Sequence, residues 1–289
     1  MERLLTFFFS LFPMSIKRSI YRIPWLANSV RQTLNKILPY GLSQVEISAG
    51  LLQGYQMSLD LQQEKDYWLG TYEPNLQDAI RDWVKPGMTA YDIGANVGYI
   101  TLMLARRVGS SGQVLAFEPL PPNVERLKLN MELNHLDERV EIYPMAVIDE
   151  TKQVEFWSGP SDDMGKVAGS AGREGITYST RFPIPAVSLD DFVFKQGHPI
   201  MNVIKMDIEG GEVLALAGMK QLLLEIQPFV FLELHGKESA QVAWQIFRAA
   251  NYTMTQMGKG YPPVMSLDQL DWKSYLVAFP PHFERHGLK

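Results

Sequence analysis

Short apolar runs alternate with segments of helical periodicity between residues 90 and 279, and this alternation constrains the fold more than any other feature of the chain. The runs predicted as strands are residues 90–93, 114–117, 140–147, 202–208, 229–234, 252–257 and 275–279. The segments predicted as helices are residues 97–108, 124–131, 188–194, 212–226 and 239–250. This order predicts an α/β fold with a doubly wound, mostly parallel sheet, in which ligands bind beyond the carboxyl ends of the strands.

Two further segments complete the predicted organisation. Residues 45–61, with turn points at Gly50 and Gly54, predict a hairpin-like pair of strands, and a helix is expected at residues 75–84. Residues 151–186 form an irregular excursion that contains strand-like stretches at 154–157 and 176–182. We therefore divide the chain into an N-terminal helical and hairpin extension, residues 1–70, and a main domain, residues 71–289.

The amino terminus opens with an apolar run that ends at Pro13, before the Lys17-Arg18 pair. A membrane-spanning helix needs about 20 apolar residues, so this run is too short to cross a bilayer. Basic and apolar residues alternate from there to Lys36, a pattern suited to an anionic membrane surface or to packing on the main domain. We expect a cytoplasmic protein with possible peripheral contact to the inner face of a membrane.

Composition excludes several classes of site. The chain has no cysteine, and its five histidines lack metal-ligand spacing, so we expect no metal ion. The formal net charge is -5 and no long run of Lys or Arg occurs in the main domain. A nucleic-acid partner is therefore not expected, because nucleic-acid binding requires clustered positive charge.

The segment YDIGANVG, residues 91–98, is a glycine-bearing turn between a predicted strand and a predicted helix. It lacks the G-x-G-x-x-G pattern of dinucleotide sites, since Asn96 and Tyr99 occupy the second and third glycine positions. The unpaired N–H groups at the start of the helix suit a carboxylate, and Glu118, at the end of the next strand, can accept hydrogen bonds from ribose hydroxyls. S-adenosylmethionine carries both a carboxylate and a ribose. We expect Glu118, beside the glycine turn, to bind the ribose, and a helix cap or a salt bridge is its alternative role.

The stretch YEPNLQDAIRDWVKPGMTAYDIGANVGYITLMLARRVGSSGQVLAFEPLPPNVERLKLN, followed by VIKMDIEGGEVLALAG, resembles the FkbM family of S-adenosylmethionine-dependent methyltransferases. The resemblance covers about residues 72–257. It implies the class I methyltransferase fold, a Rossmann-like seven-stranded sheet whose last strand is antiparallel. It also implies O-methylation of a hydroxyl on a sugar, glycan, lipid or other natural product.

The resemblance assigns cofactor-binding roles by position. Asp92, Gly94, Asn96 and Gly98 match the cofactor loop of the family, and Glu118 matches its ribose carboxylate. The segment from Asp207 to Gly210 matches the stretch after the fourth strand.

Tyr72 and Glu73 precede the loop in the matched stretch, and we expect both to contact the cofactor. An aromatic ring can stabilise the sulfonium by a cation–π contact, and plain core packing is the alternative for Tyr72.

Methylation of a hydroxyl requires removal of its proton, and three residues at strand ends are candidate acceptors: His235, Glu209 and Asp207. Glu233 is a candidate for orienting His235, and Glu212 is expected to stabilise the start of its helix. Asp207 and Glu209 could also act only as helix caps.

Two other functions stay open at this point. One is a nucleotide-dependent oxidoreductase, and the other is a domain that binds the cofactor or a glycan without turnover.

Overall fold

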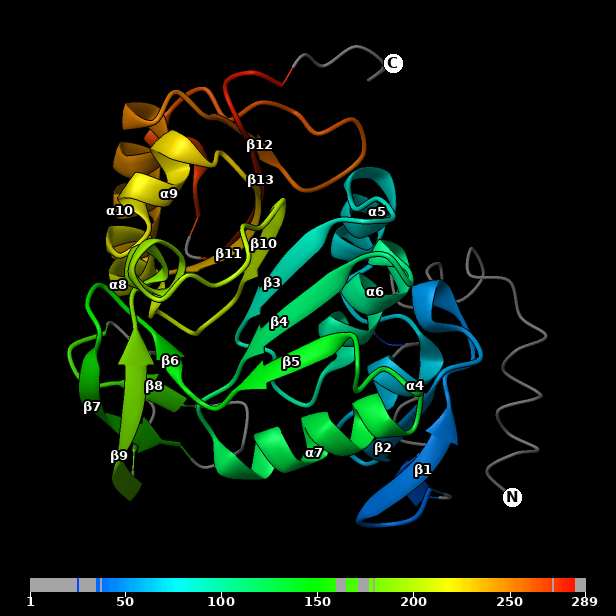
Figure 1. The fold of residues 1–289 in the computed structure, drawn as a ribbon. Helices are drawn as coiled ribbons and strands as arrows, with labels where there is room; N and C mark the ends of the chain where they lie inside the picture. Colours follow the sequence, from blue (N-terminus) through cyan, green and yellow to red (C-terminus); the bar gives the residue numbers. More distant parts are fainter. Residues whose placement is uncertain are drawn as a thin grey trace.

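The computed structural model describes residues 25, 35–36, 38–159, 165–170, 177–178, 180–271 and 273–283. Its centre is a seven-stranded sheet of order β12-β13-β11-β10-β3-β4-β5 (Figure 1). The strands are β3 (Thr89–Ile93), β4 (Gln113–Phe117), β5 (Val140–Tyr143), β10 (Val203–Met206), β11 (Phe229–His235), β12 (Thr253–Gln256) and β13 (Lys273–Phe279). Strands β5, β4, β3, β10 and β11 pair in parallel, whereas β13 runs antiparallel between β11 and β12. The predicted sheet with an antiparallel last strand is confirmed.

Helices cover both faces of this sheet because its strands are apolar on both sides. One face packs against α5 (Pro74–Trp83), α6 (Tyr99–Val108) and α7 (Pro121–Glu132). The other packs against α8 (Glu212–Ala217), α9 (Lys220–Glu225) and α10 (Lys237–Ala249). On β3, Ala90 belongs to the first core and its neighbour Tyr91 to the second, as the alternation of side chains along a strand requires.

The predicted hairpin is present as β1 (Leu42–Glu46) and β2 (Gln56–Asp60), which pair antiparallel and enclose the short helix η1 (Gly50–Leu52). Helix α4 (Lys65–Leu69) follows, and apolar side chains of all these elements join the core beneath α5 and α6. The predicted boundary at residue 70 therefore falls within a stretch of continuous packing.

The amino-terminal surface helix stays a prediction, because residues 1–24 lie outside the described residues. Within the described part of the chain, every helix is too short or too polar to cross a membrane.

Three predicted elements differ in the structure. The strand expected at 140–147 is two strands in different sheets, β5 and β6 (Ala146–Val147), because the chain turns at Pro144 and Met145. The helix expected at 212–226 ends at Gly218, where a Cβ would lie 2.1 Å from the carbonyl oxygen of Ile148, and α9 begins afterwards. The helix expected at 188–194 is the π-helix η2 (Asp191–Lys195).

The irregular excursion folds into a second, four-stranded sheet of order β6-β9-β7-β8, formed with β7 (Lys152–Ser158), β8 (Gly165–Val167) and β9 (Thr180–Val187). It has a small core of its own, which includes Phe156 and Ile184. Figure 1 shows the arrowheads of β4 and β5 pointing toward this small sheet. The excursion therefore covers the edge of the main sheet at which ligands are expected. The last short helix, η3 (Leu267–Gln269), lies between β12 and β13.

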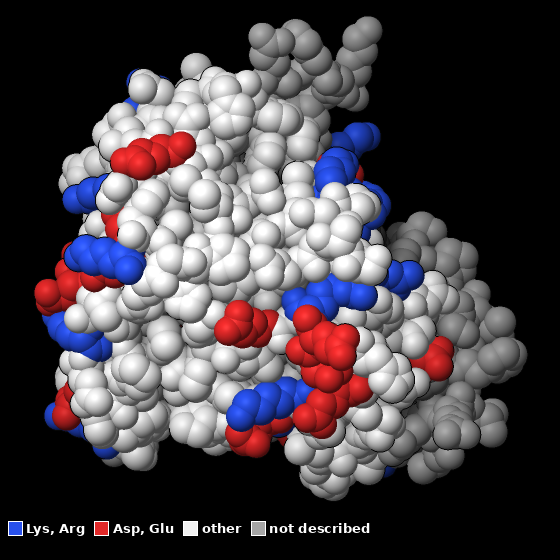
Figure 2. Space-filling model, viewed as in Figure 1, with Lys and Arg blue, Asp and Glu red and all other residues white. Residues whose placement is uncertain are grey.

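Charged side chains of both signs are interspersed on the face of the molecule drawn in Figure 2. A broad uncharged area separates them across the middle of this face, so no large single-sign patch is visible there.

Candidate functional site

The glycine-bearing turn leads from β3 into α6 and lies against the segment that follows β10. Gly94 has φ +78°, and a Cβ at this position would stand 2.0 Å from the carbonyl oxygen of Asp207. Asn96 (φ +50°) and Gly98 (φ +94°) are also left-handed, and Gly98 ends the turn just before α6. The turn requires glycine at residue 94 because two backbone segments meet there.

Glu118 ties this turn to the end of β4. Its Oε2 accepts a hydrogen bond of 2.9 Å from the backbone N–H of Asn96, and its Oε1 accepts one of 3.0 Å from the N–H of Leu120. The carboxylate is 5% exposed, and burial raises the pKa of Glu118 although its hydrogen bonds oppose the shift. The structure thus brings together two features that the sequence analysis assigned to one ligand.

Asp92 stabilises the turn indirectly, through Lys205. Its carboxylate is fully buried, accepts a hydrogen bond of 2.6 Å from the hydroxyl of Thr101, and lies 3.3 Å from the ammonium nitrogen of Lys205. Lys205 in turn donates a hydrogen bond of 2.8 Å to the carbonyl oxygen of Gly94. Asp92, predicted to contact the cofactor, therefore holds Lys205 and through it the backbone of the turn.

Lys205 was missed by the sequence analysis, although a signal was present. It is the one cation in the apolar strand β10, and a lysine buried in a central strand needs a carboxylate partner. Burial would lower the pKa of Lys205, but Asp92 and Asp207 outweigh burial and raise it.

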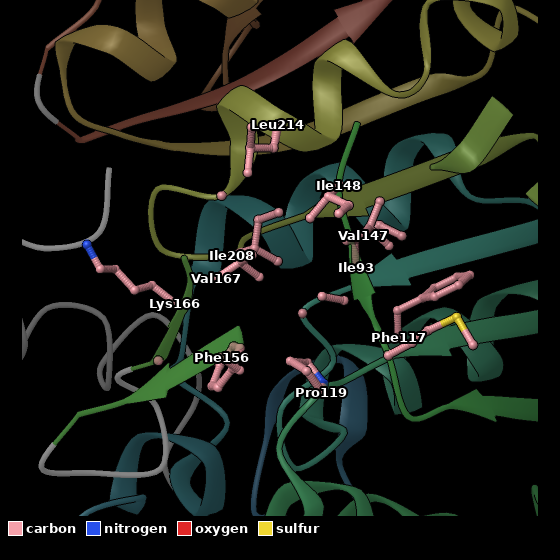
Figure 3. Close-up of a pocket in the computed structure, with 15 residues that line it drawn as sticks. Ile93, Phe117, Pro119, Val147, Ile148, Phe156, Lys166, Val167, Ile208 and Leu214 are labelled. Carbon is pink, nitrogen blue, oxygen red and sulfur yellow. The ribbon is translucent and has the colours of Figure 1, made fainter. Parts of the chain in front are cut away.

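A mainly apolar cavity opens beyond the carboxyl ends of β3, β4, β5 and β10 (Figure 3). Gly94 lines it directly, and Glu118 stands in the sequence between two of its lining residues, Phe117 and Pro119. The remaining walls come from the segments after β5 and β10 and from the small sheet: Ile93, Met145, Ala146, Val147, Ile148, Phe156, Gly165, Lys166, Val167, Ile208, Gly211 and Leu214. Apolar walls with few polar groups suit a flat ring such as a nucleobase.

Asp207, Glu209 and His235 come together beside the turn, as expected for residues at neighbouring strand ends. The imidazole Nε2 of His235 lies 3.9 Å from Asp207 Oδ1, 3.6 Å from Glu209 Oε2 and 3.0 Å from Glu233 Oε1. His235 is 1% exposed. Glu209 has φ +55°, a strained conformation for a non-glycine residue, at the turn after β10.

Glu212 organises this cluster from within the core. Its carboxylate is fully buried and accepts hydrogen bonds from the backbone N–H groups of Ile208 and Gly210 and from the hydroxyl of Ser239. It also lies 3.1 Å from Nδ1 of His235. The predicted helix-start acid therefore fixes both the loop that carries Glu209 and the orientation of the imidazole.

These contacts decide the charge of His235. Burial would lower its pKa, but the hydrogen-bonded carboxylate of Glu212 and the nearby carboxylates of Glu233 and Glu209 outweigh burial and raise the pKa to about 10. His235 is thus an imidazolium at neutral pH. An imidazolium cannot accept a proton, so the geometry favours a carboxylate for that role.

The pKa values of the neighbouring carboxylates are also shifted. Burial raises the pKa of Asp207, against the attraction of Lys205. Burial would raise the pKa of Glu233 too, but its hydrogen bonds with His235 and Lys273 lower it.

One cluster among the described residues has the geometry to hold a metal ion. Ligand-type atoms of Asp207, Glu233 and His235 lie within 4.8 Å of one another. Lys273 already lies 2.5 Å from Glu233 Oε1, and the imidazolium of His235 adds a second positive charge. These two cations compensate the carboxylates, so we assign no metal to the cluster.

Tyr72 and Glu73 approach the same cluster from the start of α5. The ring of Tyr72 packs edge-on against Tyr67, with centroids 4.6 Å apart. Glu73 has φ +43°, and burial together with Glu233 raises its pKa. The two residues thus lie on the acidic side of the site.

Comparisons with known proteins give the family of the chain. Residues 92–254 match the family described as the Methyltransferase FkbM domain. The chain is 25% identical over 188 residues to the hexuronic acid methyltransferase AglP of Haloferax volcanii, covering 64% of this chain and 73% of the relative. It is 23% identical over 210 residues to the 2-O-methyltransferase NoeI of Sinorhizobium fredii, covering 67% and 84%.

Among solved structures, a methyltransferase FkbM from Methylobacillus flagellatus is similar, with a TM-score of 0.44 and 18% identity. The match covers 88% of this chain and 59% of that one.

Proposed function

This chain belongs to the FkbM family of S-adenosylmethionine-dependent methyltransferases, and we propose that it methylates a hydroxyl group of a sugar. The observation that carries the proposal is the joining of the β3 turn to Glu118 through the N–H of Asn96. It supports the proposal because it holds the buried carboxylate of Glu118 next to the start of α6, while Gly94 of the same turn lines the apolar cavity. A carboxylate, a ribose and a nucleobase need these three environments.

The parts of the cofactor are assigned accordingly. The apolar cavity would hold the adenine, and Glu118 would accept hydrogen bonds from the ribose hydroxyls. The start of α6 at Gly98 would hold the carboxylate of the amino-acid end, and Glu73 and Asp207 would attract its ammonium. Tyr72 contributes an aromatic edge near the sulfonium.

Methyl transfer is an in-line displacement. The cofactor would supply the methyl group, whose carbon would gain a bond to the acceptor oxygen as its bond to sulfur breaks with the electron pair left on a neutral thioether. The hydroxyl proton passes to a carboxylate, for which we propose Glu209, with Asp207 beside it. The imidazolium of His235 holds these carboxylates in place rather than taking the proton itself.

A sugar acceptor is supported by two relatives. The names of AglP and NoeI describe a hexuronic acid methyltransferase and a 2-O-methyltransferase. A screen of radiolabelled methyl transfer to sugars, glycans, lipids and natural-product hydroxyls tests the proposal. Label on a sugar hydroxyl is the expected result. A protein that binds S-adenosylhomocysteine but labels no acceptor would instead be a non-catalytic binding domain.

The ribose assignment predicts the effect of Glu118→Ala on cofactor affinity. We expect binding of S-adenosylhomocysteine to weaken by about 1–3 kcal/mol, since hydrogen bonds to a charged acceptor are lost. Isothermal titration measures this, and Glu125→Ala serves as control because Glu125 is an exposed carboxylate on α7. Unchanged affinity in Glu118→Ala, or binding of NAD as strong as that of S-adenosylhomocysteine, would contradict the assignment.

A further inference from the structure

Trp157, on the central strand β7 of the small sheet, is flanked by cations on both neighbouring strands. In the register of the sheet, Trp157 stands opposite Lys166 of β8 and Arg181 of β9. Phe156, which precedes Trp157 on β7, is buried in the core of the small sheet. Because side chains alternate along a strand, Trp157 and its two cross-strand neighbours lie on the face turned away from that core.

The side chains on this outer face are in direct contact. The guanidinium carbon of Arg181 lies 4.3 Å from the centroid of the Trp157 ring, and the ammonium nitrogen of Lys166 lies 5.2 Å from it. The same ammonium is 5.1 Å from the ring of Tyr178. We call these four residues, Trp157, Lys166, Tyr178 and Arg181, the outer-face cluster.

The outer-face cluster has an excess of positive charge. Neither Lys166 nor Arg181 pairs with a carboxylate among the described residues, and Lys166 donates only a hydrogen bond of 3.3 Å to the carbonyl oxygen of Ser170. Among the described residues, Glu155 is an acid in contact with the cluster, and its Oε2 accepts the indole N–H of Trp157 at 2.5 Å. Within the described part of the chain, two cations against this carboxylate make the cluster complementary to an anion.

The outer-face cluster borders the cavity described above. Lys166 lines that cavity together with Phe156, Gly165 and Val167. Figure 3 shows the ammonium of Lys166 extending away from the cavity centre. The adenine would fill that cavity, so a glycan acceptor would have to run outside it, over β8, to reach the aromatic rings and the two cations.

We propose that the outer-face cluster is a subsite for a carboxylate-bearing sugar unit, of the hexuronate class, within a glycan acceptor. The C–H groups of the sugar ring pack on the parts of the Trp157 and Tyr178 rings that the two cations leave uncovered. The sugar carboxylate accepts hydrogen bonds from Arg181, whose planar guanidinium fits a carboxylate, and from Lys166. This inference rests on the proposed sugar methylation and specifies the charge of its substrate.

A binding experiment with two matched probes tests the subsite. The full chain, saturated with S-adenosylhomocysteine, is titrated with a glucuronate-terminated oligosaccharide and with its glucose-terminated counterpart. We expect the wild type to bind the acidic probe at least tenfold more tightly. Arg181→Ala and Lys166→Ala should each remove most of that preference, because a charge-assisted hydrogen bond corresponds to about a tenfold change or more.

Trp157→Ala and Trp157→Phe separate the ring contact from the charge contact. We expect Trp157→Ala to weaken both probes and Trp157→Phe to keep most of the affinity. The control is Trp244→Ala, which removes another aromatic–cation pair, that of Trp244 and Arg248 on α10. Equal affinity of the wild type for the two probes, or equal effects of Trp157→Ala and Trp244→Ala, would overturn the subsite.

Binding of S-adenosylhomocysteine reports on the proposed function separately. If the wild type and every variant bind it alike while the acidic preference is absent, the subsite is wrong and the methyltransferase site stands. A wild type that fails to bind S-adenosylhomocysteine would overturn the proposed function instead.

Discussion

Gly94→Val is expected to remove cofactor binding and to lower the free energy of unfolding by roughly 2–5 kcal/mol. Two costs add up. The φ of +78° is strained for a branched residue, and the new Cβ would lie 2.0 Å from the carbonyl oxygen of Asp207. The turn and the segment after β10 must then separate, which opens the cofactor site. Denaturant unfolding and isothermal titration with S-adenosylhomocysteine measure the two effects.

A second glycine provides the control for backbone strain. Gly54 has φ +88°, and a Cβ there would meet nothing within 4 Å. Gly54→Val should therefore cost only the strain, about 1–3 kcal/mol, and leave cofactor affinity unchanged. A folded Gly94→Val protein with wild-type affinity would show that the turn does not shape the cofactor site.

The fold of the main domain could be predicted because strands buried on both faces leave a strong pattern. All seven strands of the central sheet were expected close to their observed positions. The predictions failed where tertiary contacts interrupt a local pattern. Gly218 breaks a helix because the backbone at Ile148 comes too close, and this contact joins segments 70 residues apart. Two strands of the small sheet overlap the strand-like stretches expected at 154–157 and 176–182, but their pairing into a sheet was not predicted, because it depends on contacts between β6, β7, β8 and β9.

The site was predictable in position but not in charge. Asp207, Glu209 and His235 were expected close together because each follows or ends a parallel strand at the same edge of the sheet. The positions of Gly94 and Glu118, at the ends of successive strands, predicted that both contact one ligand. The protonation of His235 depends on Glu212, which the sequence alone assigned to the start of a helix. Only the fold shows that Glu212 is buried against the imidazole. These contacts raise the pKa of His235, which favours its protonated form over the proton acceptor that the sequence suggested.

This charge state makes the two candidate proton acceptors experimentally distinct. Glu209→Gln keeps the shape of the side chain and removes its basicity, so we expect kcat to fall by about 10²–10⁴-fold with little change in S-adenosylhomocysteine affinity. His235→Ala should act mainly on stability, because Glu212 and Glu233 would lose the buried cation between them. Single-turnover kinetics and denaturant unfolding of both variants measure this difference.

The pH dependence of the wild type offers an independent check. Since the folded pKa of His235 is raised from 6.5 to about 10, its contribution to stability is complete below pH 6.5 and is lost as the pH rises through 10. If His235 were the proton acceptor, kcat would climb through the same interval as the imidazolium loses its proton. We expect kcat to show no rise with an apparent pKa near 10.

Glu238→Gln is the matched control for Glu209→Gln, because Glu238 is an exposed carboxylate in the first turn of α10, three residues after His235. We expect it to leave kcat unchanged. A near-normal kcat in Glu209→Gln would rule out Glu209 as the acceptor. Asp207 would then become the candidate, since its Oδ1 lies 3.9 Å from the same imidazole nitrogen. Asp207→Asn should then show the loss in kcat that Glu209→Gln did not, and a near-normal kcat in both variants would show that neither carboxylate is the acceptor and that water takes the hydroxyl proton.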